Sequence, residues 1–110
     1  MDARLVFIAC AHMLDKLEWP RRGTAKDSSE WVFTGMDNDF RATVAMELIN
    51  PLLKEPEVYL VLGRNDSAQI PSTDLLRVIR ENDFRLVLVK TDYSYAVVFK
   101  GNVAKVGYRT

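Results

Sequence analysis

The sequence predicts a single domain of the α/β class, bordering on α+β, in which about three helices pack on a single-layer mixed sheet of about five strands. Three observations predict this class. The chain has 110 residues, close to the commonest domain size, so we expect one hydrophobic core over residues 1–110. Helical and strand-like apolar patterns alternate along the chain. A two-residue turn signal, Gly101-Asn102, separates two β-rich runs near the C-terminus.

The N-terminal segment is predicted to form a helix from Asp2 to Leu17, because its apolar residues recur at helical spacing and Asp2 can cap it. The run is apolar on every side in its first part, so a buried strand over residues 4–9 stays an alternative. Cys10 is the single cysteine, and we expect a buried, free thiol. Pro20 ends the element, and a polar connection follows.

A short strand and a second helix are predicted next. Residues 31–34 form a β-rich run that Gly35 ends, and Asp37 or Asn38 is expected to cap the helix that follows. The apolar stripe of this helix, at four-residue spacing, consists of Phe40, Val44 and Leu48.

Proline limits the second helix. Pro51 lacks the amide hydrogen that the helix needs, so the helix should kink or restart near Asn50 and end by Pro56. Residues 58–62 are an unbroken apolar run, which is typical of a strand covered on both faces, and residues 63–70 are predicted to be the loop that leaves it.

A parallel β-α-β unit is predicted from residue 58 to residue 89. Ser72 is expected to cap a short helix, and residues 84–89 repeat the pattern of a buried strand. The inward side chains of this helix are Leu75, Leu76 and Ile79. A short connection that contains a helix implies parallel strands joined by a right-handed crossover.

The C-terminal hairpin can be predicted residue by residue. The turn at Gly101-Asn102 sets the pairs Lys100 with Val103, Phe99 with Ala104, Val97 with Val106 and Tyr95 with Tyr108. Because side chains alternate along a strand, one face collects Tyr95, Val97, Phe99, Ala104, Val106 and Tyr108. The other face carries Val98, Lys100, Val103 and Lys105.

Net charge and hydropathy limit the localisation and the kinds of partner that the protein is expected to have. The net charge is zero, and no segment reaches the length of a membrane span, so we expect a cytoplasmic protein with no membrane partner and no strong attraction to nucleic acid. The charges are nevertheless uneven. Residues 37–83 hold nine acidic residues and five basic ones, whereas residues 84–110 hold one acidic residue and five basic ones.

Aspartates follow each predicted strand and suggest an enzyme as an alternative. Asp37 and Asp39 follow the first strand, Asp66 the second and Asp92 the third. If these ends met at one edge, the carboxylates would hold Mg²⁺ for a nuclease or phosphoesterase. The stronger interpretation is, however, that these aspartates serve helix caps and turns, where aspartate is favoured for reasons unrelated to metals.

A second alternative is a module that binds RNA or DNA. Trp19 stands beside three cations, Arg21, Arg22 and Lys26, a combination that can stack on a base and neutralise phosphates. His12 is the single histidine and has no placed nucleophile, so we assign it no catalytic role.

The hypothesis that remains is a protein that works by binding. No motif specifies a catalytic residue, a cofactor or a metal, which favours a small inhibitory partner of another protein, such as an immunity protein that neutralises a basic nuclease toxin. The acidic middle segment would meet that partner. The predicted contact residues are Asp37, Asp39, Asp66 and Glu81.

Overall fold

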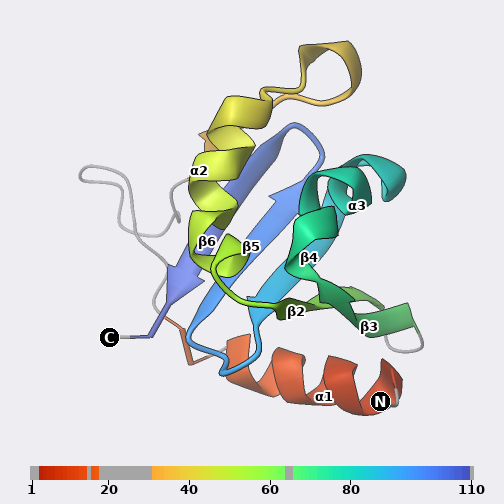
Figure 1. Cartoon of the computed structure of the whole chain (residues 1–110), viewed down its shortest axis with the longest axis vertical. Coiled ribbons are helices and arrows are strands. Elements are labelled where there is room, and N and C mark those ends of the chain that lie inside the picture. Colours follow the sequence, from red (N-terminus) through yellow and green to blue (C-terminus); the bar gives the residue numbers. More distant parts are fainter. Residues whose placement is uncertain (1–2, 15, 18–30, 64–65, 110) are drawn as a thin grey trace.

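A computed structural model describes residues 3–14, 16–17, 31–63 and 66–109 (Figure 1). The helices are α1 (Ala3–Leu14), α2 (Ala42–Leu53) and α3 (Leu75–Glu81), with short 3-10 helices η1 (Asp37–Asp39) and η2 (Ser72–Asp74). The strands are β1 (Val32–Phe33), β2 (Glu57–Gly63), β3 (Asp66–Pro71), β4 (Arg85–Lys90), β5 (Tyr95–Lys100) and β6 (Val103–Tyr108).

The strands form one six-stranded sheet in the order β1-β6-β5-β4-β2-β3. Every neighbouring pair is antiparallel. The predictions of a mixed sheet and of about five strands were therefore wrong, and the fold is α+β. The hairpin was predicted correctly, because all four expected pairs from Lys100–Val103 to Tyr95–Tyr108 are present.

Strand β3 is the element that the sequence prediction took for a loop. Its side chains are mostly exposed, so its sequence Asp-Ser-Ala-Gln-Ile-Pro lacks the apolar pattern of a covered strand. It pairs with β2 from Glu57–Pro71 to Gly63–Asp66 and lies at the edge of the sheet, where Pro71 is tolerated at its end. The pairing is reinforced where the Ser67 hydroxyl donates to the Gly63 carbonyl at 2.8 Å.

The extra strand reverses the chain and so corrects the predicted β-α-β unit. Strands β2 and β4 pair antiparallel, with Val58 opposite Lys90 and Val61 opposite Val87. Because β3 is also antiparallel to β2, β3 and β4 run parallel to each other with β2 between them. The crossover through α3 therefore joins β3 to β4 and not β2 to β4.

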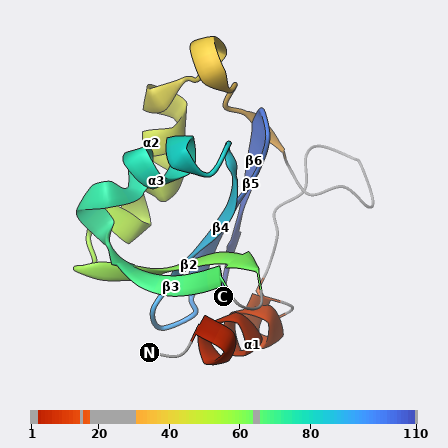
Figure 2. The ribbon, with the colours of Figure 1, turned by 90° about the vertical axis from the view of Figure 1, so that its right-hand side faces the viewer.

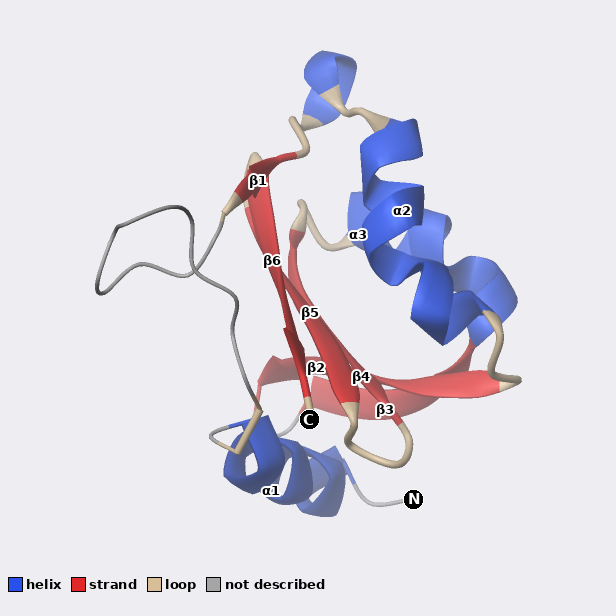
Figure 3. Ribbon diagram, turned by 90° about the vertical axis from the view of Figure 1, so that its left-hand side faces the viewer, coloured by secondary structure: helices blue, strands red, loops and turns tan. Residues whose placement is uncertain are grey.

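Helices lie on both faces of the sheet (Figures 2 and 3). We call the face toward α2 and α3 the inner face, and the opposite one the outer face. The inner face holds the larger buried cluster, whose members include Ile49, Leu52, Val58, Ile79, Leu88, Val97 and Phe99. The outer face holds a smaller cluster beneath α1, with Val6, Cys10, Leu17, Tyr59, Val61, Val89 and Ala96. Each fully buried aliphatic side chain contributes about 1.5–3 kcal/mol to the hydrophobic stabilisation.

The N-terminal helix is confirmed over Ala3–Leu14, and the alternative strand is absent there. Cys10 is buried and free, as expected. The proposed cap Asp2 and the connection at 21–29 lie outside the described residues.

The predicted caps of the second helix were wrong. Residues 37–39 form η1, whereas α2 starts after Arg41 and its first turn has no side-chain cap. The expected restart near Asn50 is also absent, because α2 continues through Pro51 to Leu53 before Pro56. Proline falls in the last turn, and the carbonyl that loses its partner belongs to exposed Glu47, which water can reach.

Ser72 does not cap α3, because the residue before that helix is Asp74 and no side-chain cap forms. The Ser72 hydroxyl instead donates to the Glu55 carbonyl, and its backbone N–H donates to the Pro56 carbonyl at 3.1 Å. Ser72 thus ties the start of the α3 segment to the link between α2 and β2, and its own polar groups are satisfied although it is buried.

Candidate functional site

The predicted acidic contact residues lie in three places. Asp37 and Asp39 are exposed on η1, which follows the edge strand β1. Asp66 opens β3, the strand at the opposite edge. Glu81 ends α3. The structure therefore brings Asp37 and Asp39 together and leaves Asp66 apart from them.

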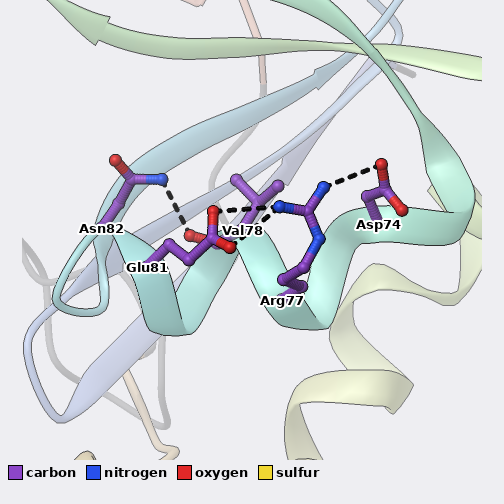
Figure 4. Close-up of polar contacts among 5 residues, drawn as sticks. All are labelled: Asp74, Arg77, Val78, Glu81 and Asn82. Atoms are coloured by element: carbon purple, nitrogen blue, oxygen red, sulfur yellow. Dashed lines mark hydrogen bonds and ion pairs between the residues drawn. The ribbon is translucent and has the colours of Figure 1, made fainter.

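Glu81 is already engaged by a cation on its own helix (Figure 4). Arg77 donates to both carboxylate oxygens of Glu81, at 2.8 and 3.0 Å, and its other terminal nitrogen lies 2.9 Å from Asp74. These two carboxylates raise the pKa of Arg77, with the hydrogen bond to Glu81 as the largest cause. The charge that this helix offers to a basic partner is reduced accordingly.

The aspartates proposed as metal ligands do not converge. Antiparallel neighbours end at opposite ends of the sheet, which separates Asp66 after β2 from Asp92 after β4. Asp92 accepts hydrogen bonds from the hydroxyl and the N–H of Ser94, at 2.5 and 3.0 Å, and the hydroxyl bond is the largest cause of its lowered pKa. Within the described ranges, no three His, Cys, Asp or Glu side chains form a group that would hold a metal ion.

The outer face beneath α1 is a closed, apolar environment, which we call the covered half. Its sheet residues are Tyr59, Val61, Val89 and Ala96. Burial raises the pKa of the Cys10 thiol from 9.0 to about 11. Desolvation is the largest cause, and a hydrogen bond to Tyr59 the second, of the raised pKa of Tyr93, about 12. The rings of Tyr59 and Tyr93 stack with their centroids 5.7 Å apart. The thiol is therefore protonated at neutral pH and is a poor nucleophile or metal ligand.

The rest of the outer face lacks a covering helix among the described elements (Figures 2 and 3). Side-chain alternation fixes its members, because Ala96 on β5 and Val87 on β4 point toward α1 and residues two positions along point the same way. Cross-strand pairing then carries the face to β6 and β1. We call the resulting set the open half: Phe33, Arg85, Val98, Lys100, Val103 and Lys105.

The open half is ordered in two cross-strand rows. The first row contains directly opposed residues from four strands, in the order Arg85, Lys100, Val103 and Phe33. In the second row Val98 lies opposite Lys105, beyond which Trp31 follows. Phe33 is 45% exposed although it is a large apolar side chain. The surface thus combines an aliphatic centre with aromatic rings and cations.

Two cations pack on the aromatic rings of this surface. The Lys105 ammonium lies 4.7 Å from the ring centroid of Trp31. The Arg41 guanidinium lies 4.9 Å from the ring centroid of Phe33. Arg41 is brought there by the turn after β1, in which its N–H donates to the Thr34 carbonyl at 2.7 Å. Each contact restrains a long cationic side chain and leaves its charge on the surface.

Sequence reasoning found only part of this surface. The hairpin prediction placed Val98, Lys100, Val103 and Lys105 on one face. It missed Arg85 and Phe33, because their positions depend on the strand order, in which β4 lies next to β5 and β1 lies next to β6. The sequence did offer one signal for Arg85, because a cation at the start of an otherwise apolar strand indicates a position that is not covered.

The residues of the nucleic-acid hypothesis, Trp19, Arg21, Arg22 and Lys26, lie outside the described residues, as does the side chain of His12. None of the described helices is long and apolar enough to cross a membrane. Comparison of the chain with protein-family models, with curated proteins and with solved structures gives no match.

Proposed function

We propose that this protein works by binding another protein and that the open half of the outer sheet face is its docking surface. The exposed row that runs from Arg85 to Phe33 is the observation that carries this proposal. Aromatic residues and arginine are enriched at protein interfaces, and arginine is prominent among the residues that dominate binding energy. A sheet face also holds such residues rigidly, which lowers the entropy lost on binding.

An inhibitory role is the form of this function that we favour. A small binding protein can block the working site of its partner by occupying it, and this needs no catalytic group. An immunity protein that neutralises a toxin acts in this way. The docking surface proposed here differs from the acidic segment that the sequence suggested, because Asp66 lies at the far edge from Asp37 and Asp39, and Glu81 is held by Arg77.

Photo-crosslinking tests the surface directly in the cells that make the protein. A photoreactive amino acid is placed at Val98 in the open half, and in a second variant at Met46, which is exposed on α2 behind the inner face. We expect one defined protein adduct from position 98 and none from position 46, because the partner should touch only the open half. An adduct from position 46 alone, or no protein adduct from position 98, would contradict the proposal.

A further inference from the structure

We infer that the partner presents an acidic surface to the open half, with carboxylates arranged around an apolar centre; this inference rests on the proposed function. The two rows hold Arg85, Lys100 and Lys105 and no acidic residue, and Arg41 adds a fourth cation above Phe33. The chain as a whole has zero net charge, so this concentration of one sign is local. Complementary potentials across an interface steer encounter and select partners.

One pair in the first row is unfavourable in the protein alone. Arg85 and Lys100 are directly opposite each other on neighbouring strands, and neither forms an ion pair with an acidic side chain in the part of the chain that the structure describes. Like charges in this position destabilise a sheet. The repulsion disappears when a carboxylate binds between the two cations, so the protein gains stability from an acidic partner.

The apolar residues of the open half determine what surrounds those carboxylates. Val98 and Val103 separate the cations of the two rows, and Phe33 ends the first row. A small anion would leave these side chains in water. A protein surface with an apolar residue at its centre would cover them and place its carboxylates on Arg85 and Lys100, where a guanidinium can bind a carboxylate through two parallel hydrogen bonds.

Single-stranded nucleic acid is the other polyanion to consider, and the contacts favour it less. Bases bind such a sheet by stacking on aromatic rings. Lys105 already packs on Trp31 and Arg41 on Phe33, so a base would compete with a cation for each ring. Proteins that bind nucleic acid also tend to carry a positive net charge, whereas this chain is neutral.

Amide-resolved NMR of the full chain tests the partner's charge with three probes: oligoglutamate, oligothymidylate and oligolysine. We expect oligoglutamate to shift the amides of β5 and β6 around Lys100 and Val103, with an effect that decreases as salt increases. Oligolysine should leave them unchanged. Stronger shifts of the same amides by oligothymidylate would overturn the inference in favour of nucleic acid, and no shift by oligoglutamate would overturn it as well.

The variant Arg85→Glu gives a second, independent readout. It turns the repulsive pair with Lys100 into an attractive one, so the midpoint of urea unfolding should rise while oligoglutamate binds about tenfold more weakly. The matched control is Lys54→Glu, which makes the same change of charge at the exposed C-cap of α2; it should leave oligoglutamate binding unchanged and should not raise the midpoint, because a carboxylate is unfavourable at the C-terminus of a helix. A fall in both stability and binding for Arg85→Glu would contradict the inference, because it would assign Arg85 a structural role.

The crosslinking experiment separates this inference from the function on which it rests. If position 98 captures a defined protein and the double variant Arg85→Glu/Lys100→Glu captures it equally well, the docking surface stands and the acidic partner is wrong. If position 98 captures no protein, the proposed function itself fails.

Discussion

The two halves of the outer sheet face share strands β4 and β5, but the covered half is apolar and the open half carries cations. Beneath α1 the face consists of Tyr59, Val61, Val89 and Ala96, all buried. Beyond α1, on the same side of the same sheet, β5 continues with Val98 and the cation Lys100. The difference shows that the polarity of a side chain on this face depends on whether α1 packs above its position, and not on the strand to which it belongs.

Element lengths explain why one helix cannot cover the whole face. Helix α1 has 12 residues and is therefore about 18 Å long. The six strands place the two edges of the sheet about 24 Å apart, before its twist is considered. The open half is thus the part of the outer face that α1 is too short to cover. Its polar and aromatic residues are typical of a surface that contacts water or a partner.

The most severe test of this comparison places the same carboxylate in each half. Val89→Asp puts a charge at a site that is 1% exposed, and we expect the free energy of unfolding to fall by about 3–5 kcal/mol. Val98→Asp should lower it by at most about 1 kcal/mol, because the new carboxylate lies opposite Lys105. Urea unfolding of the two variants measures both values, and equal losses would show that the halves do not differ in cover.

A second test disturbs the turn that brings β1 and Arg41 to the open half. Gly35 has φ +70°, and a Cβ there would lie 2.1 Å from the Asp39 carbonyl oxygen, so Gly35→Ala should cost about 3 kcal/mol. The control is Gly101→Ala, which has φ +71° but no atom closer than 3.8 Å and should cost about 1 kcal/mol. In Gly35→Ala the amide shifts around Phe33 should change while those around Val89 persist; the reverse pattern would contradict this assignment.

Thiol reactivity compares the halves without unfolding the protein. At mildly alkaline pH the raised pKa of Cys10, about 11, makes its thiolate roughly 100-fold rarer than that of an ordinary cysteine, and burial slows reaction further. A cysteine introduced by Val98→Cys, with Cys10→Ala in the same chain, should react much faster than Cys10, because position 98 is half-buried whereas Cys10 is fully buried. Alkylation followed by mass spectrometry measures both rates, and comparable rates would show that α1 does not seal its half.

The smallest expected effect is a dependence of stability on alkaline pH. The pKa of Cys10 is raised in the folded state, so the folded protein keeps a proton that the unfolded chain loses. Its contribution is complete below pH 9.0 and decreases as pH rises toward about 11, by about 1.4 kcal/mol for each pH unit of that interval. The difference in unfolding free energy between the wild type and Cys10→Ala should therefore change over this interval and stay constant below it. A constant difference at all pH values would contradict the assigned pKa.

The parts of the fold that the sequence predicted well are those in which local pattern and burial agree. The hairpin register follows from its turn and from alternation, and the apolar runs of β2 and β4 are unmistakable. The prediction missed strand β3, because an exposed edge strand does not need apolar side chains and so lacks the pattern of a buried strand. One missed strand then reversed the predicted relation of β2 and β4.

The candidate surface was predictable only as far as the hairpin reaches. Lys100 and Lys105 were placed correctly on one face from their register alone. Their neighbours Arg85 and Phe33 arrive from strands that are distant in the sequence, and the order in which strands assemble is a property of the whole core. The acidic residues show the same limit. Asp37 and Asp66 belong to one acidic segment of the sequence, but in the fold they lie at opposite edges of the sheet.

The place of β6 between β5 and β1 has a consequence for how the protein matures. Val32 and Phe33 pair with Ala104 and Val103, so β1 has no strand to join until β6 has been synthesised. During synthesis such long-range pairing comes late, because it requires closure of a long loop. The row from Arg85 to Phe33 is therefore completed only after β6 has been synthesised, and a product that ends before Val103 has no such row.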